Sequence, residues 1–295
     1  MKLGVVIVTY NRIKLLKECI DACTGQVKEF EKIYVINNAS TDGTTEYLNT
    51  LGDIKNLNVI NLEENKGGSG GFYEGLKRIQ DEDVDYILLI DDDAIIDKNL
   101  NKNINIEMDK EDDDVVAYSG IVKTNNQIQY NHRSHLKNGF KTIPSNPDEY
   151  SKPYFDYEVS TFCGLFIKRD LVKKIGLPRK DFFIWYDDCE YCLRIIKNGK
   201  IRNVNSAFLN HKTVIGSNKN QIDWKNYYGY RNRIAIYKEY FSKCNLIMYC
   251  IYLRIKMLFE FVRGKKYNAQ LINDALKDGI KDNMGKNAKY QAVKK

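Results

Sequence analysis

The first 125 residues alternate between short apolar runs, typical of buried strands, and segments whose apolar residues recur at helical spacing. Residues 2–9 form a β-branched run, and the next segment places Leu16, Cys19, Ile20 and Cys23 on one helical face. This strand–helix alternation predicts an α/β fold with a mostly parallel, doubly wound, Rossmann-like sheet. The predicted strands are 2–9, 32–36, 57–62, 86–90 and 115–122, and the predicted helices are 13–23, Ser40 or Thr41 to Leu51, and 67–80.

The pattern changes after residue 125. Residues 126–156 are polar and contain three prolines, which predicts a long excursion that can serve as a functional loop. A strand over 158–167, a helix over 187–198 and a strand over 201–210 are expected next, and the chain becomes helical from about residue 223. We therefore expect one α/β domain over residues 1–222, with halves 1–125 and 126–222, followed by a helical extension over 223–295.

The net charge of +7 is local. From Cys244 onward the chain has eleven basic and four acidic residues, so the preceding part is neutral, which disfavours a nucleic-acid binder. Residues 234–295 show an apolar face flanked by basic side chains. A helix of this kind can lie on an anionic membrane, or it can form a lid or an oligomer contact, and the sequence leaves both open. The aromatic residues of that face are Tyr249, Tyr252, Phe259 and Phe261, and the basic ones are Arg254, Lys256, Arg263, Lys265 and Lys266.

The start of the chain lacks the features of a secretory signal peptide, and no uncharged apolar stretch reaches the length of a membrane span. The seven cysteines are an odd, scattered set, which favours reduced thiols in the cytoplasm. Cys189 and Cys192 have the spacing of a redox or zinc pair, but no second pair accompanies them, and the spacing also suits one helix face.

Polar side chains follow each of the first four predicted strands. In open α/β sheets ligands bind beyond the carboxyl ends of the strands, so one ligand could contact all four loops. Each loop alone is compatible with ordinary turn chemistry. The side chains are Thr9, Tyr10, Asn11 and Arg12 after the first strand, Asn37, Asn38 and Asp42 after the second, Lys66, Gly67 and Gly68 after the third, and Asp91, Asp92 and Asp93 after the fourth.

The triple aspartate is the sharpest of these features, because three adjacent carboxylates repel one another unless they are solvated or bind a cation. Oxygen ligands favour Mg²⁺ or Mn²⁺. In an extended backbone Asp91 and Asp93 point to one side and Asp92 to the other. Asp91 and Asp93 could then share a metal while Asp92 holds a sugar hydroxyl, or Asp93 alone could bind the metal.

The glycine-rich loop at residues 67–71 lets backbone approach a ligand closely and opens a helix, whose N-terminus attracts anions. No Gly-Lys-Ser/Thr follows, so it is not a Walker A loop, and it does not follow the first strand as a dinucleotide-binding fingerprint does. Kinase-like phosphoryl transfer loses support on both counts.

A second acidic cluster runs from Trp185 to Glu190. Aromatic residues beside paired carboxylates can raise one pKa, which suits a general base, and they can also stack on a sugar ring. His211 closes a predicted strand after this cluster. It is either structural or a metal ligand.

Together these residues resemble the pattern of glycosyltransferase family 2 on the GT-A fold. The resemblance runs in order through VVIVTYNR at Val5, INNASTDGT, NKGGSGGF, LLIDDDA, FIWYDDCEYCLR and His211 to YYGYRN at Tyr227. With ALKDGIKDNMGK near the end, the chain is most similar to bacterial galactofuranosyltransferases and rhamnosyltransferases. Asn37 stands where the family commonly has Asp, although its amide can still hydrogen-bond a pyrimidine.

The resemblance implies a role for each candidate residue. It implies nucleotide-sugar binding by Thr9, Tyr10, Asn11, Arg12, Asn37, Asn38, Asp42, Lys66, Gly67, Gly68, Asp91 and Asp92, a Mn²⁺ or Mg²⁺ site at Asp91, Asp93 and His211, acceptor contacts by Trp185, Tyr186 and Asp187, and Asp188 as the catalytic base. Residues 1–125 would then be the nucleotide-sugar half and 126–222 the acceptor half.

The implied function is an inverting, metal-dependent glycosyltransferase of cell-surface polysaccharide synthesis. UDP-galactofuranose is the first choice of donor and dTDP-rhamnose the second, and the acceptor is a saccharide, such as one linked to polyprenyl diphosphate. We expect a peripheral protein on the inner face of the plasma membrane, with oligomerisation open. The alternatives are a nucleotidyltransferase, which usually has a more basic N-terminal phosphate loop than Thr9 to Arg12 supplies, and a non-catalytic carbohydrate-binding module.

Overall fold

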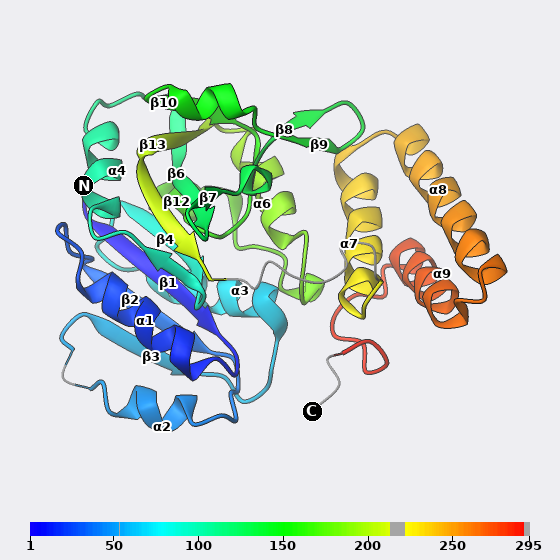
Figure 1. Ribbon diagram of the computed structural model, residues 1–295, viewed down its shortest axis with the longest axis horizontal. Helices are drawn as coiled ribbons and strands as arrows, with labels where there is room; N and C mark the ends of the chain where they lie inside the picture. Colours follow the sequence, from blue (N-terminus) through cyan, green and yellow to red (C-terminus); the bar gives the residue numbers. More distant parts are fainter. Residues whose placement is uncertain (53, 213–221, 292–295) are drawn as a thin grey trace.

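A computed structural model describes residues 1–52, 54–212 and 222–291. Its main sheet contains ten strands, ordered β10-β13-β6-β12-β4-β1-β2-β3, with β5 paired to β13 and β7 to β6 (Figure 1). The strands of this sheet are β1 (Leu3–Thr9), β2 (Lys32–Asn37), β3 (Leu57–Asn61), β4 (Tyr86–Asp91), β5 (Ala94–Ile96), β6 (Val115–Thr124), β7 (Gln127–Ile128), β10 (Tyr154–Tyr157), β12 (Leu165–Lys168) and β13 (Lys200–His211).

Helices cover both faces of this sheet, because each strand is apolar on both sides. The apolar residues of α1 and α4 pack on one face, and those of α3, α5 and α6 pack on the other. The predicted doubly wound α/β fold is confirmed, and β1, β2, β3 and β4 are parallel. The helices are α1 (Ile13–Thr24), α2 (Thr44–Asn49), α3 (Gly67–Ile79), α4 (Leu100–Met108), α5 (Arg169–Ile175) and α6 (Asp187–Ile195).

The strand register brings the candidate residues to one edge of the sheet. Thr9 pairs with Asn37, Val8 with Asp91, and Asn37 with Asn61, so β1, β2, β3 and β4 end at the same level. Parallel strands that end together leave a crevice beyond their carboxyl ends, which is where ligands bind in such sheets.

Three local expectations were wrong. Residues 126–156 contain regular structure, including part of a second sheet, ordered β11-β8-β9, from β8 (Arg133–Lys137), β9 (Lys141–Pro144) and β11 (Val159–Ser160). The strand predicted over 158–167 is two strands, interrupted before β12 at Gly164, whose φ is +87°. The second helix begins at Thr44, because Asp42 accepts hydrogen bonds from the backbone N–H and hydroxyl of Thr44, and Gly43 adopts φ +87°.

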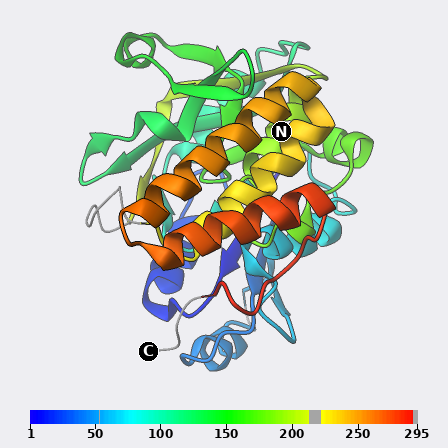
Figure 2. The same cartoon turned by 90° about the vertical axis from the view of Figure 1, so that its right-hand side faces the viewer.

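Three C-terminal helices form a separate layer at one end of the sheet (Figure 2). They are α7 (Lys225–Tyr240), α8 (Lys243–Val262) and α9 (Lys266–Lys281). Their buried residues share one apolar core with Phe182 and Phe183 of the α/β domain. The predicted helical extension is therefore present and packs on the α/β domain. None of the described helices has the length and hydropathy that a membrane-spanning segment needs.

Candidate active site

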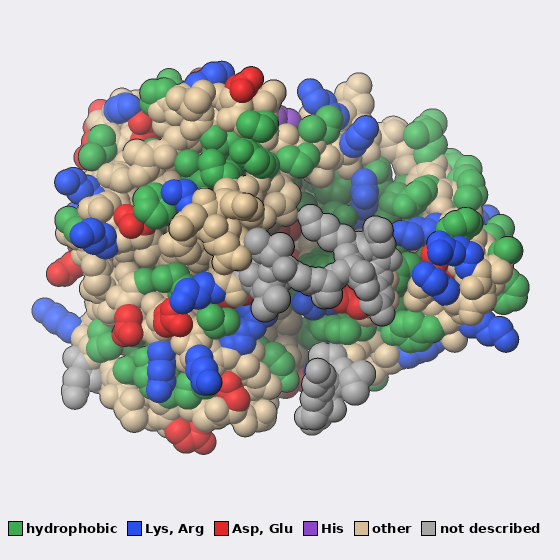
Figure 3. All heavy atoms as spheres, viewed as in Figure 1, with side chains coloured by type: hydrophobic (Ala, Val, Ile, Leu, Met, Phe, Trp, Pro, Cys, Tyr) green, Lys and Arg blue, Asp and Glu red, His purple; other side chains and the backbone are tan. Residues whose placement is uncertain are grey.

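A cleft of about 750 Å³ opens beyond the carboxyl ends of β1 to β4. Figure 3 shows the surface hollowed between the α/β domain and the C-terminal helices. The sheet side of the cleft contains eight of the predicted nucleotide-sugar residues. These are Thr9, Tyr10, Arg12, Asn38, Gly67, Gly68, Asp91 and Asp92. The opposite side contains Phe183, Ile184, Trp224, Lys225, Lys286, Ala288, Lys289 and Gln291, and Asn65 and Val8 complete the lining.

The acidic tip of β4 is held by a cation from β1's loop. Arg12 Nη1 lies 3.1 Å from Asp92 Oδ1 and 2.6 Å from Asp93 Oδ2, and the hydroxyl of Thr9 donates to Asp92 Oδ2 at 2.7 Å. The expected alternation of side chains along an extended 91–93 segment was wrong. β4 ends at Asp91 and the chain turns there, so Asp92 and Asp93 converge on the same guanidinium.

Burial and mutual repulsion perturb the titration of this tip. Burial, with the charges of Asp93 and Asp92, raises the pKa of Asp91 to about 7. Burial also raises the pKa of Asp92 to about 6, against the charge of Arg12. Burial also tends to raise the pKa of Asp93. The hydrogen bonds and positive charges of His211 and Arg12 have a larger effect, so the pKa of Asp93 lies below its usual value. The tip therefore concentrates more negative charge than Arg12 alone compensates.

His211 meets the tip because β5 pairs with the end of β13, placing His211 opposite Ala94. Its Nε2 lies 3.3 Å from Asp93 Oδ1, an atom that is buried and has no hydrogen-bond partner in the described chain. The ring of His132 stacks edge-on against His211 at a centroid distance of 5.1 Å. His132 belongs to the polar excursion, so that segment contributes to the surroundings of the site.

The donor set at the tip fits a divalent cation in its chemistry. Carboxylate oxygens and an imidazole are suitable ligands for Mn²⁺ or Mg²⁺, and the orphaned Asp93 Oδ1 beside His211 Nε2 offers two adjacent donors. Within residues 1–52, 54–212 and 222–291, however, no three acidic, imidazole or thiol groups are arranged to hold a metal ion. The pair Asp93 and His211 is formed, whereas Asp91 does not complete a ligand triad.

Asn38 couples the second strand to the glycine-rich loop. Its Oδ1 accepts from Lys66 N at 2.8 Å, and its Nδ2 donates to Gly67 O at 2.9 Å. Gly67 has φ +73°, and a Cβ there would lie 1.9 Å from the carbonyl oxygen of Phe183. Only glycine allows this approach, so the loop packs directly on the chain segment that precedes the second acidic cluster.

The other predicted nucleotide-sugar residues do not line the cleft. Asn37 is buried, and its Nδ2 donates to Thr45 Oγ1 and Asn61 Oδ1. Asp42 caps the start of α1 by accepting from Ile13 N. The other two predicted residues are Asn11 and Lys66. Asn11 Oδ1 accepts a hydrogen bond from Thr41 N at 2.6 Å, and Lys66 Nζ donates to Glu74 Oε1 at 3.1 Å. These side chains hold the turns that shape the cleft.

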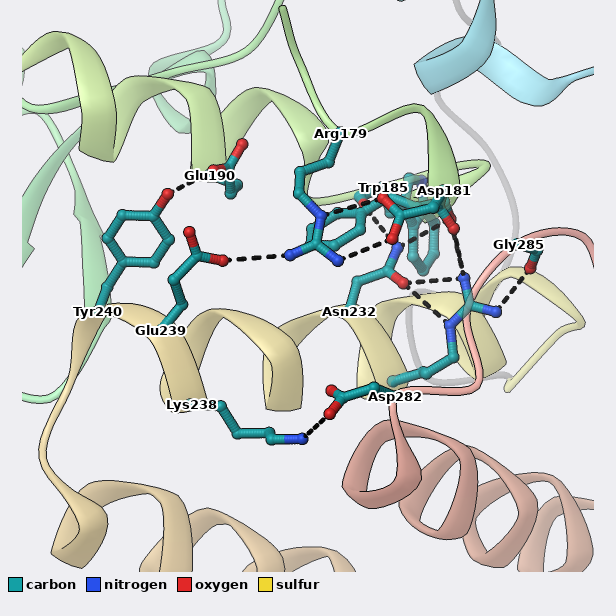
Figure 4. A network of polar contacts seen from close by, with 12 residues as sticks. Arg179, Asp181, Trp185, Glu190, Asn232, Lys238, Glu239, Tyr240, Asp282 and Gly285 are labelled. Carbon is teal, nitrogen blue, oxygen red and sulfur yellow. Dashed lines mark hydrogen bonds and ion pairs between the residues drawn. The ribbon is translucent and has the colours of Figure 1, made fainter. Parts of the chain in front are cut away.

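The loop over residues 183–186 has a strained backbone. Phe183, Trp185 and Tyr186 have φ values of +66°, +66° and +70°, a region that residues other than glycine rarely adopt. The buried Asn232 of α7 holds this conformation by donating its Nδ2 to three carbonyls (Figure 4). They are Phe182 O at 3.0 Å, Ile184 O at 3.1 Å and Trp185 O at 2.8 Å.

The acidic pair begins α6 directly after this loop. Asp187 is buried and Asp188 is partly exposed, and Asp188 Oδ1 accepts from Cys189 N at 2.7 Å. Burial and the charge of Asp188, with a smaller contribution from Asp91, raise the pKa of Asp187 well above its usual value. Burial also raises the pKa of Asp188. The acidic pair and the β4 tip thus lie within electrostatic reach of each other.

Trp185 is 41% exposed, and its indole lies against Gly229 of α7, where an added Cβ would be 3.0 Å away. Tyr186 contacts Phe140 of the excursion, with ring centroids 6.1 Å apart. Neither residue lines the cleft, nor do Asp187, Asp188, Asp93 and His211. The structure thus brings the acceptor candidates to the rim beside Phe183 and Ile184.

Sequence reasoning missed the C-terminal wall of the cleft. Trp224 and Lys225 start α7, and Lys286, Ala288, Lys289 and Gln291 belong to the segment after α9. The lysines follow a helical, basic region in which no local pattern separates a ligand contact from a solvated surface charge. Only the three-dimensional return of the chain end identifies them.

These features define an α/β domain with a mostly parallel sheet and an acidic cleft at its strand ends, and the comparisons place it in a family. The model of Glycosyl transferase family 2 matches residues 4–176, so the chain belongs to this family. The dTDP-rhamnosyl transferase RfbF of Shigella flexneri is 26% identical over 194 residues, which cover 66% of this chain and 63% of RfbF.

Poly(ribitol-phosphate) β-N-acetylglucosaminyltransferase TarS of Staphylococcus aureus is 32% identical over 120 residues, 39% of this chain and 20% of TarS. The chain thus spans less than two thirds of each of these curated relatives. A mannosyltransferase of Pyrobaculum calidifontis, solved with GDP-Man and Mn²⁺, superposes with a TM-score of 0.58 and 13% identity over 95% of this chain and 87% of that one. The GT-A fold is therefore confirmed.

Proposed function

We propose that this protein is an inverting glycosyltransferase that uses a nucleotide-sugar donor. The observation that carries the proposal is the single cleft that joins the strand-end residues Arg12, Asp91 and Asp92 to the loop that positions Asp188. Membership of family 2 and the match to RfbF support it.

Asp188 is the catalytic base in this proposal. As a carboxylate it takes the proton of an acceptor hydroxyl, and the oxygen forms a bond to the anomeric carbon from the face opposite the diphosphate. The bond between that carbon and the diphosphate breaks, and the nucleoside diphosphate leaves with the electron pair. One base and one displacement give inversion. Burial raises the pKa of Asp188, which makes it a better proton acceptor than an exposed Asp.

Asp93 and His211 would hold Mn²⁺ or Mg²⁺, which when bound supplies positive charge to the leaving diphosphate. Asp92 and Arg12 have different tasks. Asp92 is fixed by Thr9 and Arg12, so it can accept a hydrogen bond from a ribose or sugar hydroxyl. Tyr10 is 40% exposed on the cleft wall and is better placed than the engaged Asn37 to stack on the base.

UDP-galactofuranose remains the first donor and dTDP-rhamnose the second. The name of RfbF supports the latter, and the TarS structure with UDP-GlcNAc supports uridine nucleotides. The acceptor would be a saccharide of a cell-surface polysaccharide, carried on polyprenyl diphosphate. The exposed Trp185 would contact it, since exposed aromatic rings stack on sugars, and the half-buried Tyr186 beside it would support the contact.

A donor panel tests the function. Purified protein is incubated with Mn²⁺, a lipid-linked acceptor extract and UDP- or dTDP-sugars, and products are detected by mass. Transfer of one hexose from a UDP- or dTDP-sugar, lost in Asp188→Asn, supports the proposal. Release of pyrophosphate from an NTP would indicate a nucleotidyltransferase, and nucleotide binding without turnover would indicate a binding module.

We also propose that the outer face of α8 rests on an anionic lipid bilayer, which would bring the cleft to a lipid-linked acceptor. The predicted face was partly wrong, because Tyr249 is buried against Tyr237 of α7. The exposed apolar residues recur at helical spacing along α8, and green side chains gather there at the right-hand edge of Figure 3. This apolar stripe consists of Ile247, Met248, Ile251, Ile255, Leu258, Phe259 and Val262, with exposed fractions between 51% and 83%.

Charge complementarity identifies the lipid. Exposed Arg254, Arg263, Lys265 and Lys266 flank the apolar stripe, and such a helix binds anionic headgroups while its apolar side enters the interface. Flotation with phosphatidylglycerol vesicles should retain the protein, and phosphatidylcholine vesicles should retain less. Ile255→Glu should abolish retention, whereas Ile106→Glu, a matched exposed isoleucine on α4, should not. No flotation of the wild type, or dimers lost in Ile255→Glu, would refute a membrane contact.

A further inference from the structure

The last described segment of the chain forms one wall of the cleft. After α9 the backbone reverses at Asp282, where φ is +56°, and returns toward the strand ends (Figure 1). We refer to residues 283–291 as the C-terminal strap. Its residues Lys286, Ala288, Lys289 and Gln291 line the cleft opposite Asp91 and Asp92.

The first half of the strap is held by Arg231, the neighbour of the Asn232 that holds the loop over 183–186, and by Asp181. Gly285 N donates to Asp181 O at 2.7 Å, and Arg231 Nη1 donates to Gly285 O at 2.6 Å (Figure 4). Arg231 Nη2 also donates to Phe182 O at 3.1 Å. One buried arginine therefore links the strap to the loop that positions the catalytic pair.

Its second half is fixed by an aromatic socket. Tyr290 is fully buried, its ring stacks on Tyr227 at a centroid distance of 4.4 Å, and its hydroxyl donates to Asp274 Oδ2 at 2.7 Å. The hydroxyl of Tyr228 donates to Tyr290 O at 2.9 Å and accepts from Asn287 N at 3.0 Å. These hydrogen bonds and the stacked ring fix the position of the strap. They therefore also fix where its cleft-lining side chains lie.

The strap carries a cation that the fold does not use internally. Lys286 Nζ lies 3.4 Å from the backbone carbonyl of Asn65 and 5.8 Å from the ring centroid of Phe183, and no carboxylate of the described residues is within ion-pair distance. Two other cations of the cleft are paired with carboxylates, whereas Lys225 of α7 has no such partner among the described residues and lies over the ring of Trp224. Arg12 is paired with Asp92 and Asp93, and Lys289 Nζ lies 2.7 Å from Asp274.

We propose that the C-terminal strap completes the donor site and that Lys286 binds the diphosphate of the nucleotide. The inference rests on the proposed function. The diphosphate of a nucleotide is negatively charged and needs a positively charged side chain nearby. The carboxylates of the β4 tip cannot provide that positive charge. Lys286 reaches the cleft from the side opposite the tip, so the phosphates would sit between the two walls, with Asn65 and Phe183 orienting the lysine.

Nucleotide titrations separate this role from simple packing. Binding of UDP and UMP, or of dTDP and dTMP, is followed by calorimetry for the wild type and three variants. Lys286→Met removes the charge and keeps the chain length over Phe183. Lys281→Met is the matched control, because Lys281 ends α9, is exposed and does not line the cleft. Lys286→Arg keeps the charge.

We expect Lys286→Met to bind the diphosphate about tenfold more weakly, the typical worth of a charge-assisted hydrogen bond. The monophosphate should lose less, so the preference for diphosphate over monophosphate falls. Lys281→Met should match the wild type, and Lys286→Arg should recover most of the preference. An unchanged preference in Lys286→Met would overturn the inference while leaving the proposed function intact. Failure of the wild type to bind either nucleotide would overturn both.

A second variant tests the anchor. Tyr290→Ala empties the socket against Tyr227 and should release the strap, so that the preference for diphosphate falls as in Lys286→Met. Tyr290→Phe keeps the ring stacked on Tyr227 and removes only the hydrogen bond to Asp274, so its preference should stay near the wild-type value. Equal diphosphate preference in Tyr290→Ala and the wild type, with the variant folded by circular dichroism, would show that the strap's position does not matter for binding.

Discussion

Two groups of carboxylates lie near this cleft, one at the β4 tip and one directly after the loop over 183–186, and they differ in their counter-charges. At the β4 tip Arg12 contacts both Asp92 and Asp93, and His211 lies beside Asp93. At the start of α6, Asp187 and Asp188 have no basic side chain within ion-pair distance among the described residues. The first group has Arg12 and His211 beside it, whereas the second, with Asp187 buried and Asp188 partly exposed, has no basic side chain beside it among the described residues.

The difference explains how residues of one type can have two tasks. Asp93, beside Arg12 and His211, has a lowered pKa, whereas burial without a neighbouring cation raises the pKa of Asp187 and Asp188 and favours proton acceptance. The tip therefore suits the diphosphate and its metal, and the α6 pair suits the acceptor hydroxyl. A substitution in one group should therefore leave the function of the other group unchanged.

The largest effect is expected at the α6 pair. Asp188→Asn should lower turnover by about 10³-fold, because general-base catalysis typically contributes 10² to 10⁴. Nucleoside diphosphate affinity should stay within about twofold, since the tip is untouched. Steady-state kinetics and calorimetry measure both. Asp187→Asn serves as the control within the pair, and a larger loss in that variant would make Asp187 the base.

The tip should respond in the opposite way. His211→Ala should raise the Mn²⁺ concentration for half-maximal activity by about 10 to 100-fold, the range for loss of a ligand partner. Nucleotide binding measured with EDTA should be unaffected. His135→Ala is the matched control, because His135 bonds Glu149 and Glu158 away from the cleft. An identical metal titration for both variants would assign His211 a purely structural role.

The loop that carries the α6 pair depends on Asn232. Asn232→Ala removes one donor from each of three carbonyls, and it should lower kcat/KM about tenfold along with Tm. Asn101 is equally buried and donates to Lys28 O, so Asn101→Ala is a matched loss of stability far from the cleft. If the two variants lose Tm and kcat/KM in the same proportion, Asn232 does not position the loop.

The smallest expected effect is on the pH dependence of kcat, which should distinguish the α6 pair from the β4 tip. Burial raises the pKa of Asp188, so its base form is lost as pH falls through a value above that of an exposed Asp. The fall of kcat on the acid side of the pH profile should therefore occur at a higher pH than an exposed Asp would give. Activity should be retained above that pH. The residual rate of Asp188→Asn should lack this fall. Persistence of the fall in that variant would assign it to another group.

The alternating apolar pattern was sufficient to predict the sheet, because its strands are buried on both faces and bounded by polar loops. It was also sufficient to predict which loops meet, since parallel strands end together, as the register of Thr9, Asn37 and Asp91 shows. The turn after Asp91 could not be read from spacing, because it depends on Arg12 drawing Asp92 and Asp93 together. The C-terminal wall was equally hidden, since Lys286 reaches the cleft only through the burial of Tyr290.

The central claim is that the two carboxylate groups act in one reaction, the β4 tip on the donor diphosphate and the α6 pair on the acceptor hydroxyl. A crystal structure of Asp188→Asn with Mn²⁺ and the nucleotide-sugar found by the donor panel tests it most directly. The account predicts the diphosphate at Asp91 and Lys286, with the free face of the anomeric carbon turned toward Asn at position 188. A donor bound outside the cleft, or one whose anomeric carbon faces away from α6, would contradict it.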